Sequence, residues 1–505
     1  MKILSSEQVR AVDQYTIEKE PIASVDLMER AASTFCEWFI ENFDSQNTVH
    51  IFCGQGNNGG DGLVIARILL KNGYTVQTSI LKLKDKGSSD FEENLKRLKK
   101  VKKHRSKIIE KKKDIPKGIE ADVIIDALFG SGLDRPLKGL PAQLVTQLNL
   151  ENALKVAVDI PSGLKADENS EGVIFMANYT FCFERPKQAF FLAQNADYVG
   201  YWSFRSIGLN KDFIDTLKTN NQLITFKEAS ILLRERSKFS HKGTYGHAMI
   251  IGGSHGKSGA VILATKACMR AGAGLCSAHI PSYATTALHT SVPEAMLNID
   301  AHKYLVSKVD IPKKVNALGI GPGMGQGEIT EAALKELIDN TSLPSVWDAD
   351  ALNLLVQNPK YLKKLPARSI LTPHPKEFER LFGKTKNNWE QIELLRKKAK
   401  QLKLIIVLKG AHTAVALPDG NIWWNNTGNP GMATGGSGDV LTGFITGFLA
   451  QNYSPEQAAI LSVYLHGLAG DLALESLHPN YILASDIIHY FNDALRKLSL
   501  GLIEE

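Results

Sequence analysis

Residues 54–62 are Gly54-Gln-Gly-Asn-Asn-Gly-Gly-Asp-Gly62, which lie between an apolar run at 49–53 and an apolar run at 62–71 with helical spacing. Five glycines in nine residues allow tight backbone turns and bring amide N–H groups close to an anion at a helix N-terminus. A strand, a glycine turn and a helix in this order are typical of a βαβ unit with a parallel sheet. The stretch therefore predicts an α/β fold with a ligand site at the glycine turn.

The alternation of strand and helix patterns extends outward from this stretch and restarts after a polar segment at 208–221. A length of 505 residues suits two large or three ordinary domains. We expect two three-layer αβα domains, 1–220 and 221–505. The expected strands are 49–53, 75–81, 122–127, 155–160, 179–184, 200–204, 247–252, 275–280, 315–319, 345–348 and 404–409; the expected helices are 62–71, 90–103, 141–150, 258–271, 328–339, 439–450, 455–476 and 484–498, with a hairpin at Asp419-Gly420.

Composition excludes several classes of protein. A hydrophobic content of 44% and a charged content of 22% are ordinary for folded domains and argue against disorder. Five cysteines, without a Cys-x-x-Cys pair, indicate neither a disulfide framework nor a thiolate zinc site, so a reducing compartment fits best. The N-terminal residues do not resemble a signal peptide, and we see no apolar run of the length a bilayer needs. We therefore expect a cytoplasmic protein with no membrane partner.

The net charge of +6 arises from one segment, because residues 82–117 hold 15 Lys and Arg against 6 Asp and Glu and the rest of the chain is net negative. This segment lacks the interleaved aromatic residues of a single-strand nucleic-acid surface. We interpret it as a solvated face and expect no nucleic-acid partner, with a small anionic partner as the alternative.

The glycine turn formally contains Gly-x-Gly-x-x-Gly, the dinucleotide fingerprint. That fingerprint also requires an acidic residue about 20 positions on, at the end of the next strand, to hold a ribose. Here the next strand ends Thr78-Ser-Ile-Leu81, with no acid. A hydride-transferring dehydrogenase is therefore disfavoured, while a plain turn in which Asp61 caps a helix remains an alternative.

Oxygen-bearing side chains follow neighbouring strands of the first domain. Asp126 and Asp159 end two strands, and Ser162 follows in Asp159-Ile-Pro-Ser-Gly163. The carboxyl ends of parallel strands meet at one sheet edge, so these residues should lie around one crevice with Asn58. Oxygen ligands without His or Cys suit a hard cation, and a site of low total charge with backbone carbonyls would suit a monovalent one. Each aspartate taken alone could equally be a turn or cap residue.

Residues 1–215 resemble the YjeF-type N-terminal domain of the NAD(P)H-hydrate epimerases, through GQGNNGGDG, the strand at 122–129 and VDIPSG. The resemblance implies a Rossmann-like fold and interconversion of the R and S forms of NADHX and NADPHX. It implies a potassium ion on Asn58, Asp126 and Ser162, and Asp159 as acid or base at the reacting carbon. The implied substrate contacts are Asn57, Asn58, Gly59, Gly60, Asp61, Gly130, Ser131, Gly132, Leu133, Asp134, Arg135, Pro136 and Asp159.

One position departs from that family pattern. The segment Arg185-Pro-Lys-Gln-Ala189 has alanine where the pattern leads us to expect glycine. The role of Lys187 is therefore left open.

A second glycine-rich segment, Asn429-Pro-Gly-Met-Ala-Thr-Gly-Gly-Ser-Gly-Asp439, leads into an apolar helix. Amides at 436–438 could form a nest for phosphate charge, and Asp439 could accept a proton from an attacking hydroxyl. An amide nest with a nearby base is typical of a phosphoryl-transfer site, although the lysine of a P-loop is absent. Two further segments fit a ligand site, although each could also be structural: Lys409-Gly-Ala-His-Thr413 after an apolar strand, and His374 between two prolines.

Residues 225–500 resemble the ribokinase-like NAD(P)H-hydrate dehydratases, through GGSxxxxGA, GPG, TPHPKE, LKGAHT and NPGMATGGSGD. The resemblance implies nucleotide-dependent dehydration of the S hydrate, with ADP and magnesium as co-substrate and Asp439 as the catalytic base. It also implies hydrate contacts at Ala260, Gly323, His374 and Asp439, and nucleotide contacts at Lys409, Gly410, Ala411, His412, Thr413 and Gly438.

The sequence thus predicts a bifunctional repair enzyme that epimerises NAD(P)HX and dehydrates the S form at the expense of ADP, through a phosphorylated intermediate that eliminates phosphate. A homo-oligomer is expected from the resemblance. One rival is a ribokinase-like small-molecule kinase, since Gly-Ser-Gly-Asp before a helix also suits alcohol kinases. In the other rival, the first domain is a non-catalytic ligand-binding module.

Overall fold

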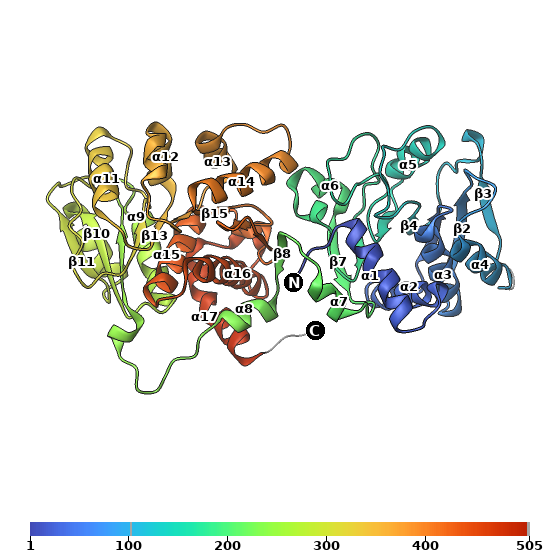
Figure 1. Ribbon diagram of the computed structural model, residues 1–505, viewed down its shortest axis with the longest axis horizontal. Coiled ribbons are helices and arrows are strands. Elements are labelled where there is room, and N and C mark those ends of the chain that lie inside the picture. The colour runs from blue at the N-terminus through green and yellow to red at the C-terminus, as the bar shows by residue number, and fades with distance from the viewer. Residues whose placement is uncertain (102–103, 502–505) are drawn as a thin grey trace. The chain divides into compact units, whose positions relative to one another are not determined.

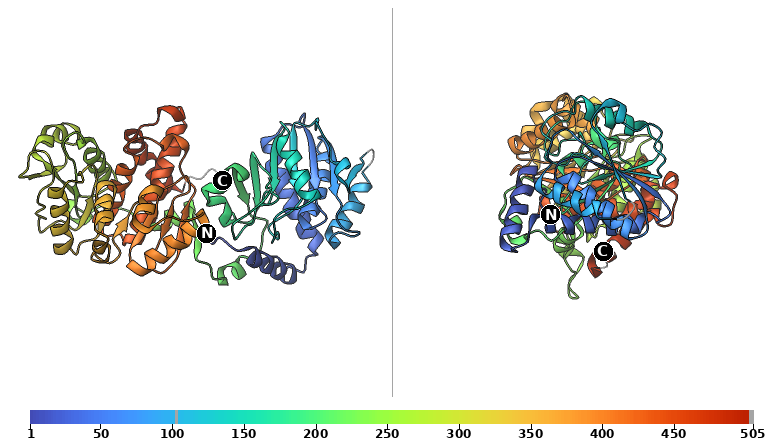
Figure 2. Two further views of the ribbon diagram at one scale, coloured as in Figure 1. Left: turned by 90° about the horizontal axis from the view of Figure 1, so that it is seen from above. Right: turned by 90° about the vertical axis from the view of Figure 1, so that its right-hand side faces the viewer.

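The structure is a computed structural model that describes residues 1–101 and 104–501. The chain forms two compact units, Lys2–Thr219 and Asn220 to the C-terminus, the latter including Met1. Each unit has its own parallel-type sheet with helices on both faces (Figures 1 and 2). The expected class of fold, two αβα units, is confirmed.

The N-terminal unit contains a seven-stranded, wholly parallel sheet in the order β3-β2-β1-β4-β5-β6-β7. Its strands are β1 Thr48–Cys53, β2 Thr75–Leu81, β3 Ser106–Ile109, β4 Val123–Ala127, β5 Leu154–Val158, β6 Tyr179–Phe183 and β7 Tyr201–Arg205. Its helices are α1 Ser6–Lys19, α2 Ser24–Asn42, α3 Asn57–Lys71, α4 Ser89–Lys99, α5 Leu140–Leu150, α6 Ala196–Val199 and α7 Lys211–Thr216.

Alternate residues of the central strand β1 face two different cores. Ile51 packs with α2, α3 and α4, in a cluster that includes Phe35 and Leu63. Phe52 points to the other face and packs with Leu144 of α5. This two-sided burial explains why β1 is apolar without the alternation of a half-exposed strand.

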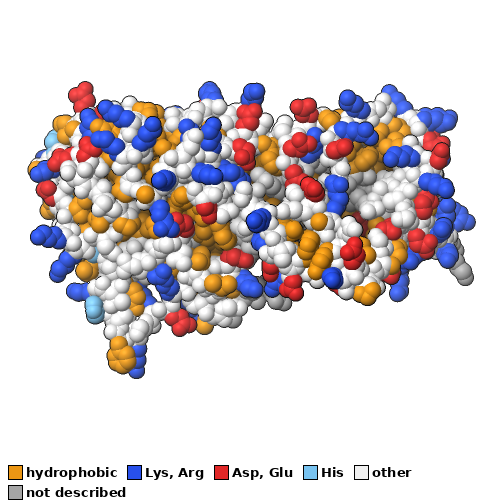
Figure 3. Space-filling model, in the orientation of Figure 1, with side chains coloured by type: hydrophobic (Ala, Val, Ile, Leu, Met, Phe, Trp, Pro, Cys, Tyr) orange, Lys and Arg blue, Asp and Glu red, His pale blue; other side chains and the backbone are white. Residues whose placement is uncertain are grey.

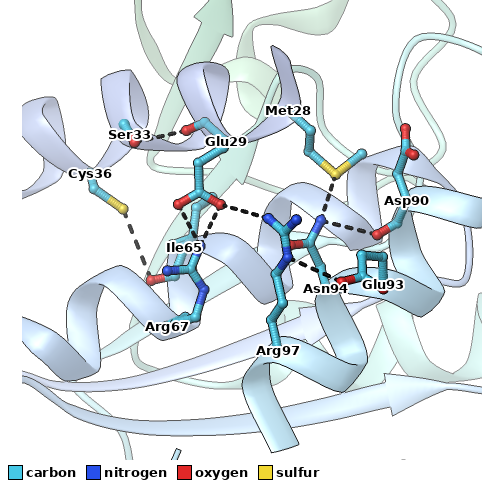
Figure 4. A network of polar contacts seen from close by, with 10 residues as sticks. All are labelled: Met28, Glu29, Ser33, Cys36, Ile65, Arg67, Asp90, Glu93, Asn94 and Arg97. Atoms are coloured by element: carbon cyan, nitrogen blue, oxygen red, sulfur yellow. Dashed lines mark hydrogen bonds and ion pairs between the residues drawn. The ribbon is translucent and has the colours of Figure 1, made fainter. Parts of the chain in front are cut away.

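Helix α3 is fixed on the sheet by ionic and polar contacts to its neighbours (Figure 4). Glu29 of α2 pairs with Arg67 of α3 and lies 3.8 Å from Arg97 of α4. Close by, Asn94 of α4 donates to Met28 Sδ at 3.3 Å. A methyl group at Gly60 would lie 2.7 Å from the same sulfur, so this glycine lets α2 approach α3. These contacts hold in place the helix whose N-terminus forms the glycine turn.

The glycine turn also depends on close backbone packing. A Cβ at Gly59 would lie 1.8 Å from the carbonyl oxygen of Gly54, and one at Gly54 would lie 2.0 Å from that of Leu128. Gly56, in the same turn, has open space around it. Several of the glycines are therefore required for the fold, whatever ligand the turn binds.

We expect Gly59→Ala to destabilise the protein by at least about 3 kcal/mol, because a backbone atom rather than a flexible side chain must move to make room. Gly56→Ala is the matched control and should change stability by less than about 1 kcal/mol. Urea unfolding of both variants beside the wild type measures the difference. Equal transition midpoints for the two variants would contradict this packing argument.

The C-terminal unit contains a ten-stranded sheet in the order β11-β10-β9-β12-β13-β14-β15-β16-β17-β8, in which only β16 pairs antiparallel with its neighbours. Its strands are β8 Asn221–Ile224, β9 His247–Ile251, β10 Leu275–Pro281, β11 Met296–Asp300, β12 Ala317–Ile320, β13 Ser345–Trp347, β14 Ile370–Leu371, β15 Ile405–Leu408, β16 Ala414–Ala416 and β17 Ile422–Asn425.

The helices of this unit cover both sheet faces (Figures 1 and 2). They are α8 Phe226–Leu232, α9 Ser258–Arg270, α10 Thr285–Ser291, α11 Glu328–Asn340, α12 Ala349–Gln357, α13 Pro375–Phe382, α14 Asn388–Leu402, α15 Ser437–Ala450, α16 Pro455–Leu474 and α17 Ala484–Leu500. Gly443 and Gly447 of α15 allow it to pack closely on α9, because a Cβ at either would lie within 2.7 Å of α9 or the residue that follows it.

Among the described residues, α16 is long and apolar enough to cross a membrane by length and composition alone, and 72% of that window is buried inside the unit. A mostly buried helix of this kind is also what the core of a globular domain contains.

Several sequence expectations differ from the structure. No strand is expected between 81 and 122, yet Ser106–Ile109 forms edge strand β3, which pairs with β2. The polar stretch 208–221 holds the short helix α7, and strand β8 begins at Asn221, beside β17. The expected helix 90–103 is observed as Ser89–Lys99, and Lys102 and Lys103 lie outside the described residues.

Most of the described Lys and Arg side chains of the basic segment are exposed. Figure 3 shows Lys and Arg side chains mixed with Asp and Glu over the part of the N-terminal unit that carries α4 and β3. This distribution fits a solvated face.

Candidate functional sites

The proposed cation ligands of the N-terminal unit lie together at the carboxyl ends of β1, β4 and β5. Asp126 accepts hydrogen bonds from Ser162 Oγ and Ser162 N, both at 2.7 Å. A Cβ at Gly130 would lie 3.2 Å from Asn58, which brings the loop after β4 against the start of α3. The Asn58 Nδ2 atom is buried and has no hydrogen-bond partner among the described residues.

The chemistry of this oxygen set fits a hard cation of low charge. Asp126 is fully buried, and burial raises the pKa of its carboxyl to about 6 despite the hydrogen bonds from Ser162. One carboxylate, one amide and one hydroxyl provide oxygen donors with a total charge of −1, which suits potassium better than a divalent ion.

Asp159 stands directly after β5 in a left-handed backbone conformation, with φ +66°. Aspartate adopts this region more readily than most residues, but it remains uncommon outside glycine, and such strain concentrates at functional sites. The residue's carboxylate accepts a hydrogen bond from Lys187 Nζ at 2.7 Å.

Lys187 is the partner that sequence reasoning left without a role. Its side chain is buried and also contacts Cys182 Sγ at 3.0 Å. Burial by itself would lower the pKa of Lys187, but the contacts with Asp159 and Cys182 raise it above its usual value. The charged Lys187 side chain and the Asp159 carboxyl group thus form a largely buried ion pair, and such pairs concentrate at functional sites.

Two more carboxyl groups surround this pair. Burial and the charge of Asp159 raise the pKa of Asp13, on α1, to about 7. Burial together with Asp159 and Asp13 raises the pKa of Asp61, on α3, well above its usual value. Sequence reasoning missed Asp13 because it lies in an amphipathic helix without a motif.

The remaining residues expected to contact the hydrate occupy two segments, the start of α3 and the loop after β4, which meet where a Cβ at Gly130 would lie 3.2 Å from Asn58. Asn57 is exposed at the start of α3, while Gly59 and Gly60 are buried within its first turn. The second segment, 130–136, is a loop after β4 whose residues are exposed or half-buried.

Asp439 of the C-terminal unit lies in the first turn of α15. Gly436 precedes the helix in the left-handed conformation, with φ +93°. Burial and the negative charge of Asp348 raise the pKa of Asp439 to about 7, against the effect of Lys409. A carboxyl that titrates near neutral pH at a helix N-terminus is suited to general base catalysis.

A partly buried ion pair lies beside this helix start. Lys409 Nζ donates to Asp348 Oδ1 at 2.9 Å, and Thr442 Oγ1 of α15 donates to Asp348 Oδ2 at 2.8 Å. A Cβ at Gly438 would lie 3.3 Å from Lys409 Nζ, so a larger residue would crowd this point. Asp348 was missed because the sequence analysis took it only as the end of a strand.

The expected hydrate contacts Gly323 and Ala260 adjoin each other, since a Cβ at Gly323 would lie 3.2 Å from Ala260 Cβ. Asp350 organises the neighbouring backbone by accepting from Gly325 N at 2.9 Å and pairing with Lys257 Nζ at 3.3 Å. These polar contacts of Asp350 thus join the ends of β12 and β13 to the start of α9.

Helix α16 supports the glycine-rich segment that precedes Asp439. Asp471 accepts from Gly428 N at 2.8 Å and from Asn429 Nδ2 at 3.1 Å. His466 Nε2 donates to Ser437 O at 3.0 Å, and burial lowers the pKa of this histidine to about 4, so it stays neutral. Both ends of the segment are therefore anchored on one helix, a role that the sequence did not reveal.

His374 and residues 409–413 occupy turns at the same sheet edge. His374 caps α13, and its Nδ1 accepts from Lys376 N at 3.1 Å. Gly410 and Ala411 are exposed in the turn between β15 and β16, where Thr413 Oγ1 donates to Gly410 O at 3.1 Å. His374 thus has a structural role, in addition to the hydrate contact that the resemblance implies.

These features define an α/β enzyme. One unit holds a buried lysine–aspartate pair, and the other holds a glycine-rich helix N-terminus of the kind that binds phosphate in phosphoryl-transfer enzymes. Residues 24–189 match the family profile of the YjeF-related protein N-terminus, and residues 248–492 match that of NAD(P)H-hydrate dehydratase. The chain belongs to the family of bifunctional NAD(P)H-hydrate repair enzymes, which join an epimerase and a dehydratase.

Relatives that carry this description span nearly the whole chain. The one from Moorella thermoacetica is 36% identical over 99% of this chain and 97% of its own length. The one from Escherichia coli is 34% identical over 86% and 83%. A crystal structure of the ADP/ATP-dependent NAD(P)H-hydrate dehydratase from Bacillus subtilis, obtained with ATP and magnesium, is 32% identical, covers 56% of this chain and all of that one, and superposes with a TM-score of 0.50.

Proposed function

We propose that residues 1–220 epimerise the R and S hydrates NADHX and NADPHX, and that residues 221–505 dehydrate the S hydrate with ADP and magnesium. The observation that carries this division is the presence of one acid–base centre in each unit, Asp159 with Lys187 and Asp439 with the start of α15. We also propose, from the family's chemistry, that the protein acts in the cytoplasm as a homo-oligomer.

In the epimerase unit, Asp159 passes a proton to the hydroxyl of the hydroxyl-bearing carbon, so that it leaves as water, and takes a proton back when water adds to that carbon from the other face. Epimerisation there requires proton transfer as hydroxyl leaves from one face of the ring and returns to the other. Lys187 donates a hydrogen bond to the Asp159 carboxyl group and fixes its direction. Residues 57–61 and 130–136 contact the dinucleotide.

Asn58, Asp126 and Ser162 would hold the potassium ion, which would supply positive charge beside the substrate. The support is the buried oxygen set, in which Ser162 and Asp126 already touch. Gly130 of the substrate loop packs against Asn58, so this loop lies directly beside the proposed potassium ligands.

Replacing potassium by tetramethylammonium in the buffer should slow epimerisation at least about 10-fold, since loss of ordering in a site commonly costs this much. Dehydration of pure S hydrate should change little in the same buffers, which serves as the internal control. Rates followed by chromatographic separation of the epimers give the comparison. An epimerisation rate independent of potassium would contradict the cation assignment.

In the dehydratase unit, Asp439 takes the proton from the hydroxyl of the S hydrate as that oxygen attacks the terminal phosphorus of ADP. AMP leaves, and a phosphorylated hydrate remains. Its phosphate then departs with a ring proton from the adjacent carbon, which restores the nicotinamide double bond. Amides at 436–438 hold phosphate oxygens, Lys409 to Thr413 and Gly438 contact the nucleotide, and Ala260, Gly323 and His374 hold the hydrate.

Magnesium fits this site as an ion brought with the phosphates, and it would neutralise their charge during transfer. Asp348 and Asp350 are the described carboxylates whose charges reach the base Asp439, and they could face the ion.

The test compares this reaction with that of a simple kinase. Pure S hydrate with ADP and magnesium should yield NADH, AMP and inorganic phosphate in equal amounts. A stable phosphorylated product without return of NADH absorbance would overturn the dehydratase assignment and favour the kinase.

A further inference from the structure

Three aromatic rings form a surface cluster at the edge of the dehydratase unit: His255, Tyr283 and Tyr304. Ring centres lie 5.3 Å apart for His255 and Tyr283, and 5.1 Å apart for His255 and Tyr304. His255 is exposed, Tyr304 is 43% exposed and Tyr283 is half-buried. The cluster therefore presents aromatic surface to solvent.

The backbone holds the cluster in a fixed shape. His255 N donates to Tyr304 O at 2.8 Å, and Tyr283 N donates to Lys303 O at 3.2 Å. The Tyr283 hydroxyl donates to Ser254 O. Three separate chain segments are thus tied together at one point, so the rings need little ordering when a ligand binds.

The same loop that carries His255 also forms one wall of the expected hydrate site. A Cβ at Gly325 would lie 3.5 Å from Ser254, and one at Gly323 would lie 2.5 Å from Lys257 O. The loop continues into α9 and Ala260. Residues 254–257 therefore contact both the aromatic cluster and the glycines of the expected hydrate site.

Two cations accompany this surface. Lys303 Nζ lies 5.2 Å from the centre of the Tyr304 ring. Lys257 pairs with Asp350 and keeps 55% of its side chain exposed. Aromatic faces beside ammonium groups suit a ligand that combines a planar base with phosphate.

We propose that this aromatic cluster binds the adenine base at the far end of the NAD(P)H hydrate, with Lys257 and Lys303 directed to its phosphates. The inference rests on the proposed function, which places the hydrated nicotinamide ring at Gly323, Ala260 and Asp439. The rest of the dinucleotide must then leave the site carrying a diphosphate and a second base. Residues 254–257 lead from those contacts to the cluster, and a purine can stack on its rings.

The test uses two substrates that differ only in this half: the S hydrate of NADH, and the S hydrate of reduced nicotinamide mononucleotide, which has no adenosine. For Tyr304→Ala we expect KM for the dinucleotide hydrate to rise about 10-fold, the scale of one lost stacking contact. Its kcat and its KM for ADP should stay within about twofold, as should its KM for the mononucleotide hydrate.

Two variants accompany it as controls. Tyr304→Phe keeps the ring and should behave as wild type. Phe239→Ala removes an aromatic side chain that is 92% exposed elsewhere in the same unit, and it should change none of these constants.

Each other outcome overturns the proposal in a recognisable way. Equal changes for the two hydrates, or no change for either, would show that the cluster does not bind adenine. A rise in KM for ADP alone would place the co-substrate's base there instead. If the wild type dehydrates neither hydrate, the proposed function itself fails, and the inference fails with it.

Discussion

Asp439→Asn is expected to lower kcat for dehydration of the S hydrate by about 10²- to 10⁴-fold, the range associated with loss of a general base. The variant keeps the shape of the side chain but cannot accept the hydroxyl proton. Asparagine is also well tolerated near a helix start, so the fold should survive. Return of NADH absorbance with ADP and magnesium measures the rate.

Asp493→Asn serves as the matched control, because it removes an exposed carboxylate from α17 of the same unit. It should dehydrate at the wild-type rate. Dehydration by Asp439→Asn within about threefold of wild type would exclude Asp439 as the base.

The pH dependence of dehydration follows from the same carboxyl. Because burial and Asp348 raise the pKa of Asp439 to about 7, the group is protonated below that pH and cannot act as a base. The wild-type kcat should therefore rise with pH through about 7 and then level off, with a single ionisation. A kcat that is flat between about pH 5.5 and 8 would contradict this assignment.

The second large effect concerns the epimerase centre. Asp159→Asn should lower the rate of epimerisation by about 10²- to 10⁴-fold while leaving dehydration of pure S hydrate intact. Asparagine also tolerates the left-handed conformation that Asp159 adopts, so backbone strain is preserved. The rate is measured by chromatographic separation of the R and S hydrates.

Lys187→Met tests the partner in that pair. It removes the ammonium that contacts the carboxylate at 2.7 Å and should slow epimerisation by a comparable factor. Lys211→Met, at an exposed position on α7, is the control. Wild-type epimerisation by both Asp159→Asn and Lys187→Met would remove this centre from the mechanism.

The sequence was most informative where backbone chemistry is local. The segments 54–62 and 429–439 each open a helix, as predicted, because glycine and first-turn aspartate have direct consequences for the residues beside them. Helix α3 nevertheless begins at Asn57, five residues before the expected start at Gly62. Long apolar strands such as β1 and β9 were also found at their predicted positions.

The features that could not be predicted from the sequence depend on contacts between segments that are far apart in the chain. Strand β3 is short and lies among charged residues, and it exists because it pairs with β2. Lys187 is 28 residues from Asp159, and no spacing rule joins them. Asp348 meets Lys409 only because β13 and β15 end at the same sheet edge. His466 and Asp471 support the glycine-rich segment from a helix that reads simply as apolar.

The most direct test of the whole account supplies the wild type with a mixture of R and S NADHX, ADP, magnesium and potassium. NADH absorbance is followed against an enzyme-free control that records spontaneous epimerisation. The account predicts rapid, complete return of NADH by the wild type, and return of only the S share, followed by slow spontaneous recovery, by Asp159→Asn. Complete and rapid recovery by Asp159→Asn, or no recovery by the wild type, would contradict it.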